Sequence, residues 1–338
     1  MKQAGRFTRD GKPFNFDVIT DRLDNSNLVL LGVSGSGKSV NLVEKLIDSV
    51  ARHNARLVIV DPGASLDLMV TALEAQGKTI NRQTATWSSS STFDSVALLQ
   101  DESVESLIVN TTHELSLRML CSDTTMQDVI HFDISPLAQR GKNLEKVTFV
   151  TSILCAVSEC LSKIKDDGRP TIVVYDEFHY LFESAHSAFA AASEIALQHL
   201  NSQNAWVWLA SQNIMDIPVQ LYTLLKRFEW WEVLQVSEHE IESIRNCRPI
   251  TDDEVAQISS LKRRTGVFVE GMLLSRPDES VNPVFCYAAT SVSVALSMNE
   301  PFEKKRRTDL MRSFGLTEMQ AVQEIAKELD LSRFSYAN

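Results

Sequence analysis

The stretch from Leu28 to Val50 restricts the possible folds of this chain more than any other segment; it reads LVLLGVSGSGKSVNLVEKLIDSV. A short apolar run leads into a loop with the pattern G-x-x-x-x-G-K-S, and an amphipathic helix follows. Glycines in such a loop allow backbone conformations that residues with a Cβ avoid, so successive N–H groups can turn inward around a phosphate. The positive N-terminal end of the helix adds to this attraction. The stretch therefore predicts a nucleotide-binding strand, loop and helix.

The loop sequence also predicts separate roles for two of its residues. Lys38 would reach the β and γ phosphates, and the hydroxyl of Ser39 would hold Mg²⁺. The predicted nucleotide-binding residues are Gly32, Val33, Ser34, Gly35, Ser36, Gly37, Lys38, Ser39 and Val40, with Asp61 as a further candidate.

A second β-rich run, Ala55–Asp61, follows the helix and ends in Asp-Pro-Gly. A strand after a strand and a helix completes a βαβ unit, whose functional loops lie at the carboxyl ends of the strands. Asp61 has two interpretations at this place. Its carboxylate either lies near the phosphates or caps the helix predicted at 65–76, and the sequence leaves both open.

A third apolar run, Thr171–Tyr175, ends in the acids Asp176 and Glu177. Strands ending in two acids are common by chance, but a preceding phosphate-binding loop and alternating strands and helices favour a functional interpretation. Asp176 would hold Mg²⁺ through water, and Glu177 would polarise the water that attacks the nucleotide. These two residues and Ser39 are therefore the predicted metal-binding and catalytic set.

A fourth run, Ala205–Ser211, is followed by Gln212. A polar residue at the end of such a strand senses the γ-phosphate in many motors with this loop. Gln212 is therefore the predicted sensor, and the alternative is that its side chain only bonds to the backbone.

These elements divide the chain into three parts. Residues 1–27 are an amino-terminal lead-in with a predicted edge strand at Phe14–Ile19, and residues 296–338 are a helical tail. Residues 28–295 alternate strands with helices, which predicts an α/β fold with a mostly parallel sheet flanked by helices. A small helical insertion is predicted within 79–140. Apolar periodicity predicts helices at 65–76, 107–120, 143–164, 186–201, 218–228, 254–261 and 316–331.

Composition limits the remaining possibilities. The chain has 338 residues, and its 44 acids against 33 bases argue against nonspecific coating of nucleic acid. The longest apolar runs fall short of a membrane span. Five cysteines, an odd number without a C-x-x-C pair, predict neither a disulfide framework nor a zinc site; they are Cys121, Cys155, Cys160, Cys247 and Cys286. This cysteine usage fits a reducing compartment.

Four segments taken together, GVSGSGKS, VIVDPG, VVYDEFHYLF and WLASQNIMDIP, resemble the ATPase domain of type IV secretion and conjugative-transfer motors. The likeness is to the TraC and DotO type, within the HerA and FtsK branch of RecA-like P-loop ATPases, and it runs from Phe14 to Val269. The resemblance implies ATP hydrolysis with Mg²⁺, in which Lys38, Glu177 and Gln212 would be the catalytic residues. The long amino-terminal domain expected of such ATPases is missing from this sequence, and no motif identifies an arginine finger.

The resemblance also implies partners and a location. It implies a hexamer or another multimer in the cytoplasm, docked at the bacterial inner membrane through channel components and other ATPases of the apparatus. In such a multimer a neighbouring subunit would supply a cation, for which Arg227, Arg263 and Arg264 are the candidates. The alternatives are a DNA-translocating pump or coupling ATPase of the same branch, which would bind double-stranded DNA, and a nucleotide-binding structural subunit that hydrolyses poorly.

Overall fold

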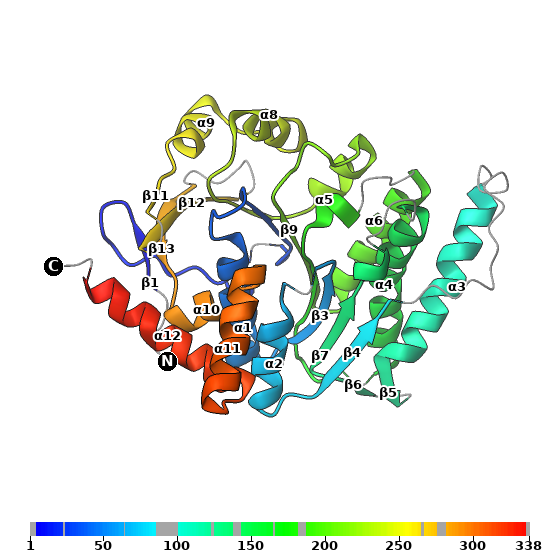
Figure 1. Cartoon of the computed structure of the whole chain (residues 1–338). Helices are drawn as coiled ribbons and strands as arrows, with labels where there is room; N and C mark the ends of the chain where they lie inside the picture. The colour runs from blue at the N-terminus through cyan, green and yellow to red at the C-terminus, as the bar shows by residue number, and fades with distance from the viewer. Residues whose placement is uncertain are drawn as a thin grey trace.

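The computed structural model describes residues 5–335 except 23, 64, 86–100, 123–124, 138–142, 165, 182–186, 265–266 and 276–281. The described part contains a sheet of 11 strands. Figure 1 shows this sheet at the centre of the molecule, with helices on both sides. Seven neighbouring strands of this sheet are parallel. In spatial order they are β10 (Trp230–Val233), β2 (Leu28–Leu31), β9 (Ala205–Ser211), β8 (Thr171–Tyr175), β3 (Arg56–Asp61), β7 (Val129–Asp133) and β4 (Ile80–Thr84).

The sheet continues antiparallel beyond β10. In spatial order these strands are β12 (Phe268–Leu274), β13 (Val284–Ala288) and β1 (Gly5–Thr8), and the short β11 (Arg263–Arg264) also pairs with β12. Two short strands, β5 (Leu120–Ser122) and β6 (Thr125–Met126), form a separate hairpin. The parallel part follows from the alternation of strands and helices, because parallel neighbours need a crossover connection.

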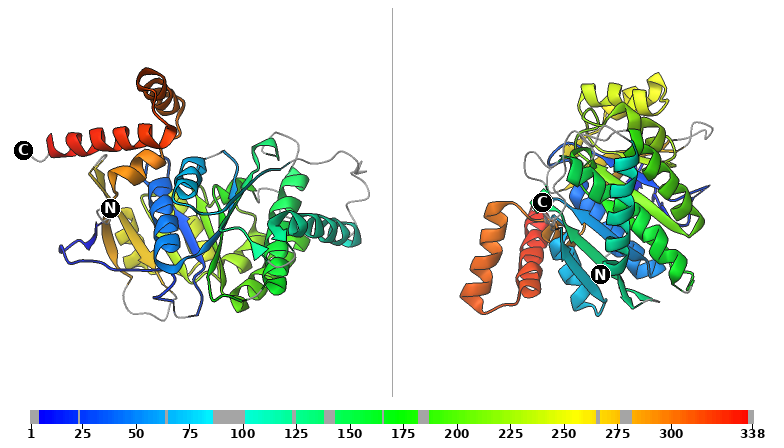
Figure 2. Two further views of the ribbon diagram at one scale, coloured as in Figure 1. Left: turned by 90° about the horizontal axis from the view of Figure 1, so that it is seen from below. Right: turned by 90° about the vertical axis from the view of Figure 1, so that its right-hand side faces the viewer.

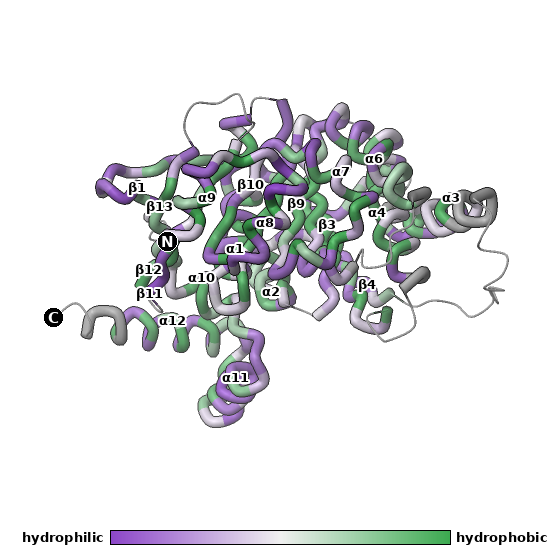
Figure 3. The backbone as a smooth tube through the Cα atoms, turned by 90° about the horizontal axis from the view of Figure 1, so that it is seen from above, coloured by the Kyte–Doolittle hydropathy of each residue, from purple (hydrophilic) through white to green (hydrophobic). Residues whose placement is uncertain are grey.

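Both faces of the parallel strands are buried, since successive side chains of a strand point to opposite faces. In β3, for example, Val58 and Val60 belong to one hydrophobic cluster, and Leu57 and Ile59 belong to the other. The hydropathy-coloured tube in Figure 3 shows these central strands as predominantly hydrophobic. This two-sided burial explains why the strands read as continuous apolar runs in the sequence.

Helices cover the two faces. The cluster with Leu57 includes side chains from α1 (Lys38–His53), α2 (Asp67–Ala75), α10 (Ser291–Leu296) and α12 (Glu318–Ser335). The opposite cluster includes side chains from α3 (Asp101–Met119), α4 (Asn143–Lys163), α6 (Ser187–Ser202), α7 (Tyr222–Leu225), α8 (Glu238–Cys247) and α9 (Asp252–Ser259). The short α5 (Phe178–Leu181) follows β8, and two 3₁₀ turns lie at Ser135–Leu137 and Val219–Leu221.

The carboxyl-terminal tail adds α11 (Pro301–Phe314), which packs on α12 and projects from the rest of the molecule in Figure 2. Arg307 anchors it, because the guanidinium donates to Glu318 Oε1 at 3.0 Å and to the carbonyl of Met298 at 3.1 Å. The tail contacts the body through α12, which packs on α10, and through Asn299, which donates to the carbonyl of Ser65.

The predicted α/β fold with a mostly parallel sheet is confirmed, but three local predictions need correction. The edge strand is Gly5–Thr8; the alternation at Phe14–Ile19 reflects an aromatic cluster, in which the rings of Phe14 and Phe285 lie 5.4 Å apart. The helix predicted at 218–228 is a 3₁₀ turn followed by the single turn of α7. Finally, β4 and β7, which lie within the predicted insertion at 79–140, both pair into the main sheet.

Candidate functional site

Backbone hydrogen bonds tie the start of the phosphate-binding loop to the ends of two strands. The N–H of Gly32 donates to the carbonyl of Ser211 at 3.2 Å, and the N–H of Val33 donates to the carbonyl of Gln235 at 3.0 Å. A Cβ on Gly32 would lie 2.3 Å from Ser36 Oγ and 3.1 Å from Leu234 Cβ, so a larger residue there would force neighbouring side chains to move. Gly37 has φ +89° at the start of α1, a left-handed conformation that a side chain would strain. The loop therefore depends on these glycines for its shape.

The strand order gathers the other predicted residues beside this loop. Strand β9 lies between β2 and β8, so its carboxyl end falls between the loop and the acidic pair that follows β8. Gln212 accordingly donates from Nε2 to Glu177 Oε1 at 2.6 Å. All the predicted catalytic residues thus meet at the same edge of the sheet.

Lys38 is the centre of the site. Its side chain is 4% exposed, and Nζ lies 3.1 Å from Asp176 Oδ1 and 2.9 Å from Glu177 Oε1. Burial by itself lowers the pKa of Lys38, but the charges of Asp176 and Glu177 outweigh it and leave this pKa raised. The lysine is therefore a permanent cation that two carboxylates hold in place.

Glu177 has an unusual backbone. Its φ of +50° lies in the left-handed region, which costs a residue other than glycine about 1 kcal/mol or more. Its N–H donates to Asp176 Oδ1 at 3.0 Å, and its buried Oε2 has no hydrogen-bond partner among the described residues. His179 Nδ1 lies 3.5 Å from this oxygen. A strained carboxylate with one oxygen that lacks a hydrogen bond suits a group that must orient a water molecule.

Asp176 and Ser39 offer the oxygen ligands that Mg²⁺ prefers. Asp176 Oδ2 accepts from Ser65 Oγ at 2.5 Å, and both Asp176 and Ser39 line one cleft. The described residues contain no cluster of three or more His, Cys, Asp or Glu side chains arranged to hold a metal on their own. A hydroxyl and a carboxylate that line one cleft fit a Mg²⁺ ion that a bound nucleotide would also help to hold.

Asp61 orders the loop that precedes α2. Its Oδ1 accepts from the N–H of Gly63 at 2.9 Å, and its Oδ2 accepts from the N–H of Leu66 at 2.8 Å. Burial raises the pKa of this carboxyl, but the imidazole of His131 and the backbone donors outweigh burial, and the pKa is lowered. Asp61 thus orders the loop before α2 without capping that helix, whose N-cap is Leu66, and it also borders the cleft; its place near the phosphates stays a prediction.

The cleft has a volume of 760 Å³ and opens at the carboxyl ends of the strands. Five of the site residues predicted from the sequence line the cleft; they are Ser39, Asp61, Asp176, Glu177 and Gln212. The tail contributes Asn299, Glu300 and Glu303, which the sequence did not identify, and Asn299 Nδ2 donates to the carbonyl of Ser65 at 2.5 Å. No spacing in the sequence connects the tail with this cleft.

Two further side chains lie beside the site, and the sequence had not identified the first of them, His179. His179 Nδ1 lies 2.8 Å from Ser211 Oγ, and burial is the main reason that the pKa of His179 is lowered. Arg263 lies against the loop of its own chain, where Nη1 donates to the carbonyl of Ser34 at 3.4 Å. The sequence left two interpretations of the basic run Lys262–Arg264 open, a solvated turn or a cation for a neighbouring subunit, and neither places Arg263 beside the loop of its own chain. The antiparallel pairing of β11 with β12 holds Arg263 in this position.

A glycine-rich loop between parallel strands, beside a strand that ends in paired acids, defines the fold of a RecA-like P-loop ATPase. Comparison of the structure with solved ones agrees. It resembles VirB4 of Thermoanaerobacter pseudethanolicus, with a TM-score of 0.59 and 16% sequence identity over 89% of this chain and 97% of that one. Likeness at this identity establishes the fold, and in this respect the resemblance drawn from the sequence is confirmed.

Two other similar structures fall below a TM-score of 0.5. The bacterial conjugative coupling protein TrwBdeltaN70 gives 0.47 with 13% identity over 84% of this chain and 88% of that chain. The genome packaging NTPase B204 from Sulfolobus turreted icosahedral virus 2, in complex with ATP-gammaS, gives 0.46 with 16% identity over 78% and 97%. No protein-family model matches the sequence, and no curated protein matches it.

Proposed function

We propose that this chain is the ATP-hydrolysing motor of a type IV secretion or conjugation apparatus. In this proposal it works as a hexamer or another multimer and couples ATP hydrolysis to channel assembly or substrate transfer. The observation that carries the proposal is the convergence of Lys38, Asp176, Glu177 and Gln212 at the carboxyl ends of three neighbouring strands.

Each of these side chains has a role in the proposal. Lys38 exchanges its carboxylate partners for the β and γ phosphates, and the backbone of the loop surrounds the same groups. The exchange frees Glu177, which orients water with the help of the amide of Gln212. A Mg²⁺ ion held by Ser39 and Asp176 would neutralise charge on the phosphates.

Location and partners form a separate part of the proposal. Every helix among the described residues is too short or too polar to span a lipid bilayer. We propose that the protein is cytoplasmic and reaches the bacterial inner membrane through channel components, with other ATPases of the apparatus as further partners.

Double-stranded DNA is not among the partners that we propose. A duplex carries one negative charge per about 1.7 Å, so a pump needs a channel lined with open cations. In the tail cluster Lys304–Arg307, Arg306 pairs with Glu328 and Arg307 pairs with Glu318. In the other cluster, Lys262–Arg264, Arg263 faces the loop of its own chain. The tail cluster therefore has part of its charge paired within the subunit, and in the other cluster Arg263 is turned toward the loop of its own chain.

An ATPase assay over a range of protein concentrations, with and without duplex DNA, tests this function. We expect Glu177→Gln to bind a fluorescent ATP analogue as the wild type does and to hydrolyse ATP about 100-fold or more slowly. We expect Lys38→Ala to lose binding. Specific activity should rise with protein concentration, and DNA should change it by less than about two-fold. Strong stimulation by DNA would favour the DNA pump, and wild-type turnover in Glu177→Gln would remove the proposed role of this acid.

A further inference from the structure

The pairing of β11 with β12 brings Arg263 to the middle of the phosphate-binding loop. Arg263 pairs with Val269 across the two strands, and Val269 Cγ2 lies 3.1 Å from where a Cβ on Gly37 would be. Nη1 of Arg263 donates to the carbonyl of Ser34, and a Cβ on Gly35 would lie 3.1 Å from the same Nη1 atom. The loop and this arginine are therefore in contact within one chain.

The charges around the loop distinguish Arg263 from Lys38. Lys38 is paired with two carboxylates, whereas Arg263 is exposed and forms no salt bridge with any acid in the described part of the chain. A guanidinium presents up to five N–H donors and matches phosphate oxygens in a bidentate geometry. Arg263 thus offers incoming phosphates a cation that has no ion pair to give up.

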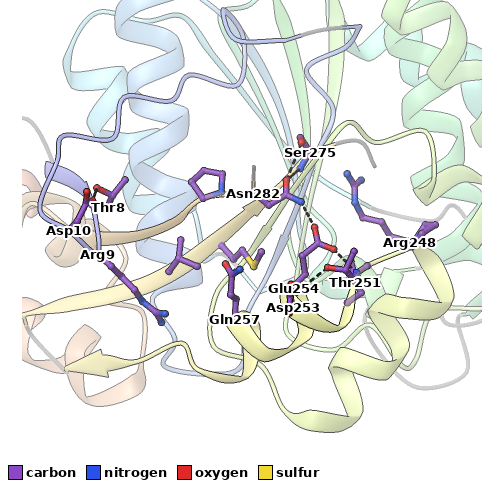
Figure 4. Close-up of a pocket in the computed structure, with 15 residues that line it drawn as sticks. Thr8, Arg9, Asp10, Arg248, Thr251, Asp253, Glu254, Gln257, Ser275 and Asn282 are labelled. Carbon is purple, nitrogen blue, oxygen red and sulfur yellow. Dashed lines mark hydrogen bonds between the residues drawn. The ribbon is translucent and has the colours of Figure 1, made fainter. Parts of the chain in front are cut away.

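The hairpin that carries Arg263 is held by a chain of hydrogen bonds. The N–H of Lys262 donates to Glu270 Oε2 at 2.9 Å, and the N–H of Glu270 donates to the carbonyl of Lys262 at 2.8 Å. Arg9 clamps the same carboxylate, with Nε 3.1 Å from Oε1 and Nη2 2.8 Å from Oε2. Figure 4 shows Arg9 at the rim of a pocket between the amino-terminal segment and α9. Because its strand is fixed in this way, Arg263 is preorganised beside the loop.

We propose that Arg263 binds the polyphosphate of the nucleotide held by its own subunit. This inference rests on the proposed function, because it concerns the same nucleotide site. It differs from the expectation that Arg263 reaches a neighbouring subunit, since the contacts of Arg263 with Ser34 and Gly35 are both intramolecular. The next residue, Arg264, is a matched control, because successive side chains of a strand point to opposite sides and Arg264 is also exposed.

The first test measures the affinity of fluorescent ATP and AMP analogues for the wild type and three variants. We expect Arg263→Ala to weaken ATP binding by about ten- to 100-fold, since a charge-assisted hydrogen bond to phosphate is lost. The loss for AMP, which lacks the β and γ phosphates, should be several-fold smaller. Arg264→Ala should bind ATP within about two-fold of the wild type. Lys38→Ala serves as the control for the site itself.

The outcomes separate the two proposals. Normal ATP binding by Arg263→Ala, together with lost binding by Lys38→Ala, would overturn the inference and leave the proposed function intact. Normal ATP binding by Lys38→Ala would instead contradict the proposed function. Thermal melting of Arg263→Ala without nucleotide should match the wild type, because the side chain is exposed.

A second measurement distinguishes the subunit that provides the arginine. ATP affinity is measured at a protein concentration at which mass photometry detects monomers, and again at micromolar concentration. If Arg263 acts within its own subunit, the Arg263→Ala defect has the same size in both conditions. A defect that disappears in the monomer would show that the arginine serves a neighbouring subunit and would overturn the inference.

Discussion

Replacing Lys38 with methionine should destabilise the nucleotide-free protein, and the structure sets the size of the loss. The substitution keeps most of the side-chain volume but removes the cation from between Asp176 and Glu177. The side chain of Asp176 is 3% exposed and that of Glu177 is 23% exposed. Glu177 can therefore regain water, whereas Asp176 remains buried without its ion pair.

Breaking a buried ion pair by removing one partner costs about 3 to 5 kcal/mol. We expect the lower end, about 3 kcal/mol, because Asp176 lines a cleft that water can enter. For a chain of 338 residues, a loss of this size lowers the melting temperature by about 4 °C. Adding Asp176→Asn should recover most of the loss, because the uncompensated charge is then gone.

Thermal denaturation of the three proteins without nucleotide checks this reasoning. Lys327→Met is the surface control: this lysine is 68% exposed and pairs with Glu324, so its loss should cost less than about 1 kcal/mol. The argument is refuted if Lys38→Met melts with the wild type, or if Asp176→Asn recovers none of the loss. Either result would mean that the three charges do not depend on one another in the free protein.

Two further predictions concern other side chains. Gln212→Ala should bind ATP normally and hydrolyse it about tenfold or more slowly in single-turnover experiments, because Glu177 loses the amide that orients it; an unchanged rate would assign Gln212 to a structural role. Burial lowers the pKa of Lys45 to about 8 from the ordinary 10.5, so between these pH values the unfolded chain binds the proton more strongly. The stability of the wild type relative to Lys45→Met should therefore rise as the pH increases from about 8 to 10.5, and should change little below pH 8, where both states hold the proton. Urea denaturation of both proteins across this pH range measures the difference in their free energies of unfolding. A difference that does not change with pH would contradict the prediction.

The pattern of local signals explains which parts of the site the sequence could predict. The residues from Gly32 to Ser39, and the acids after Thr171–Tyr175, are close together in the chain and have residue types fixed by phosphate and metal chemistry. Strands buried on both faces also give continuous apolar runs, so β2, β3, β8 and β9 were recognised with nearly their true bounds. The edge strand β1 was misplaced because a four-residue strand beside solvent needs no apolar pattern.

What the sequence determined by itself was the phosphate-binding loop, the acidic pair and the α/β class, since each is encoded by neighbouring residues. The tertiary structure alone decided that β9 lies between β2 and β8, which turns Gln212 toward Glu177. It also brought Arg263, separated from Ser34 by more than two thirds of the chain, into contact with the loop, and placed Asn299 at the cleft. Such contacts follow from strand order and register, which depend on packing across the whole sheet. The spacing of neighbouring residues in the sequence therefore does not indicate them.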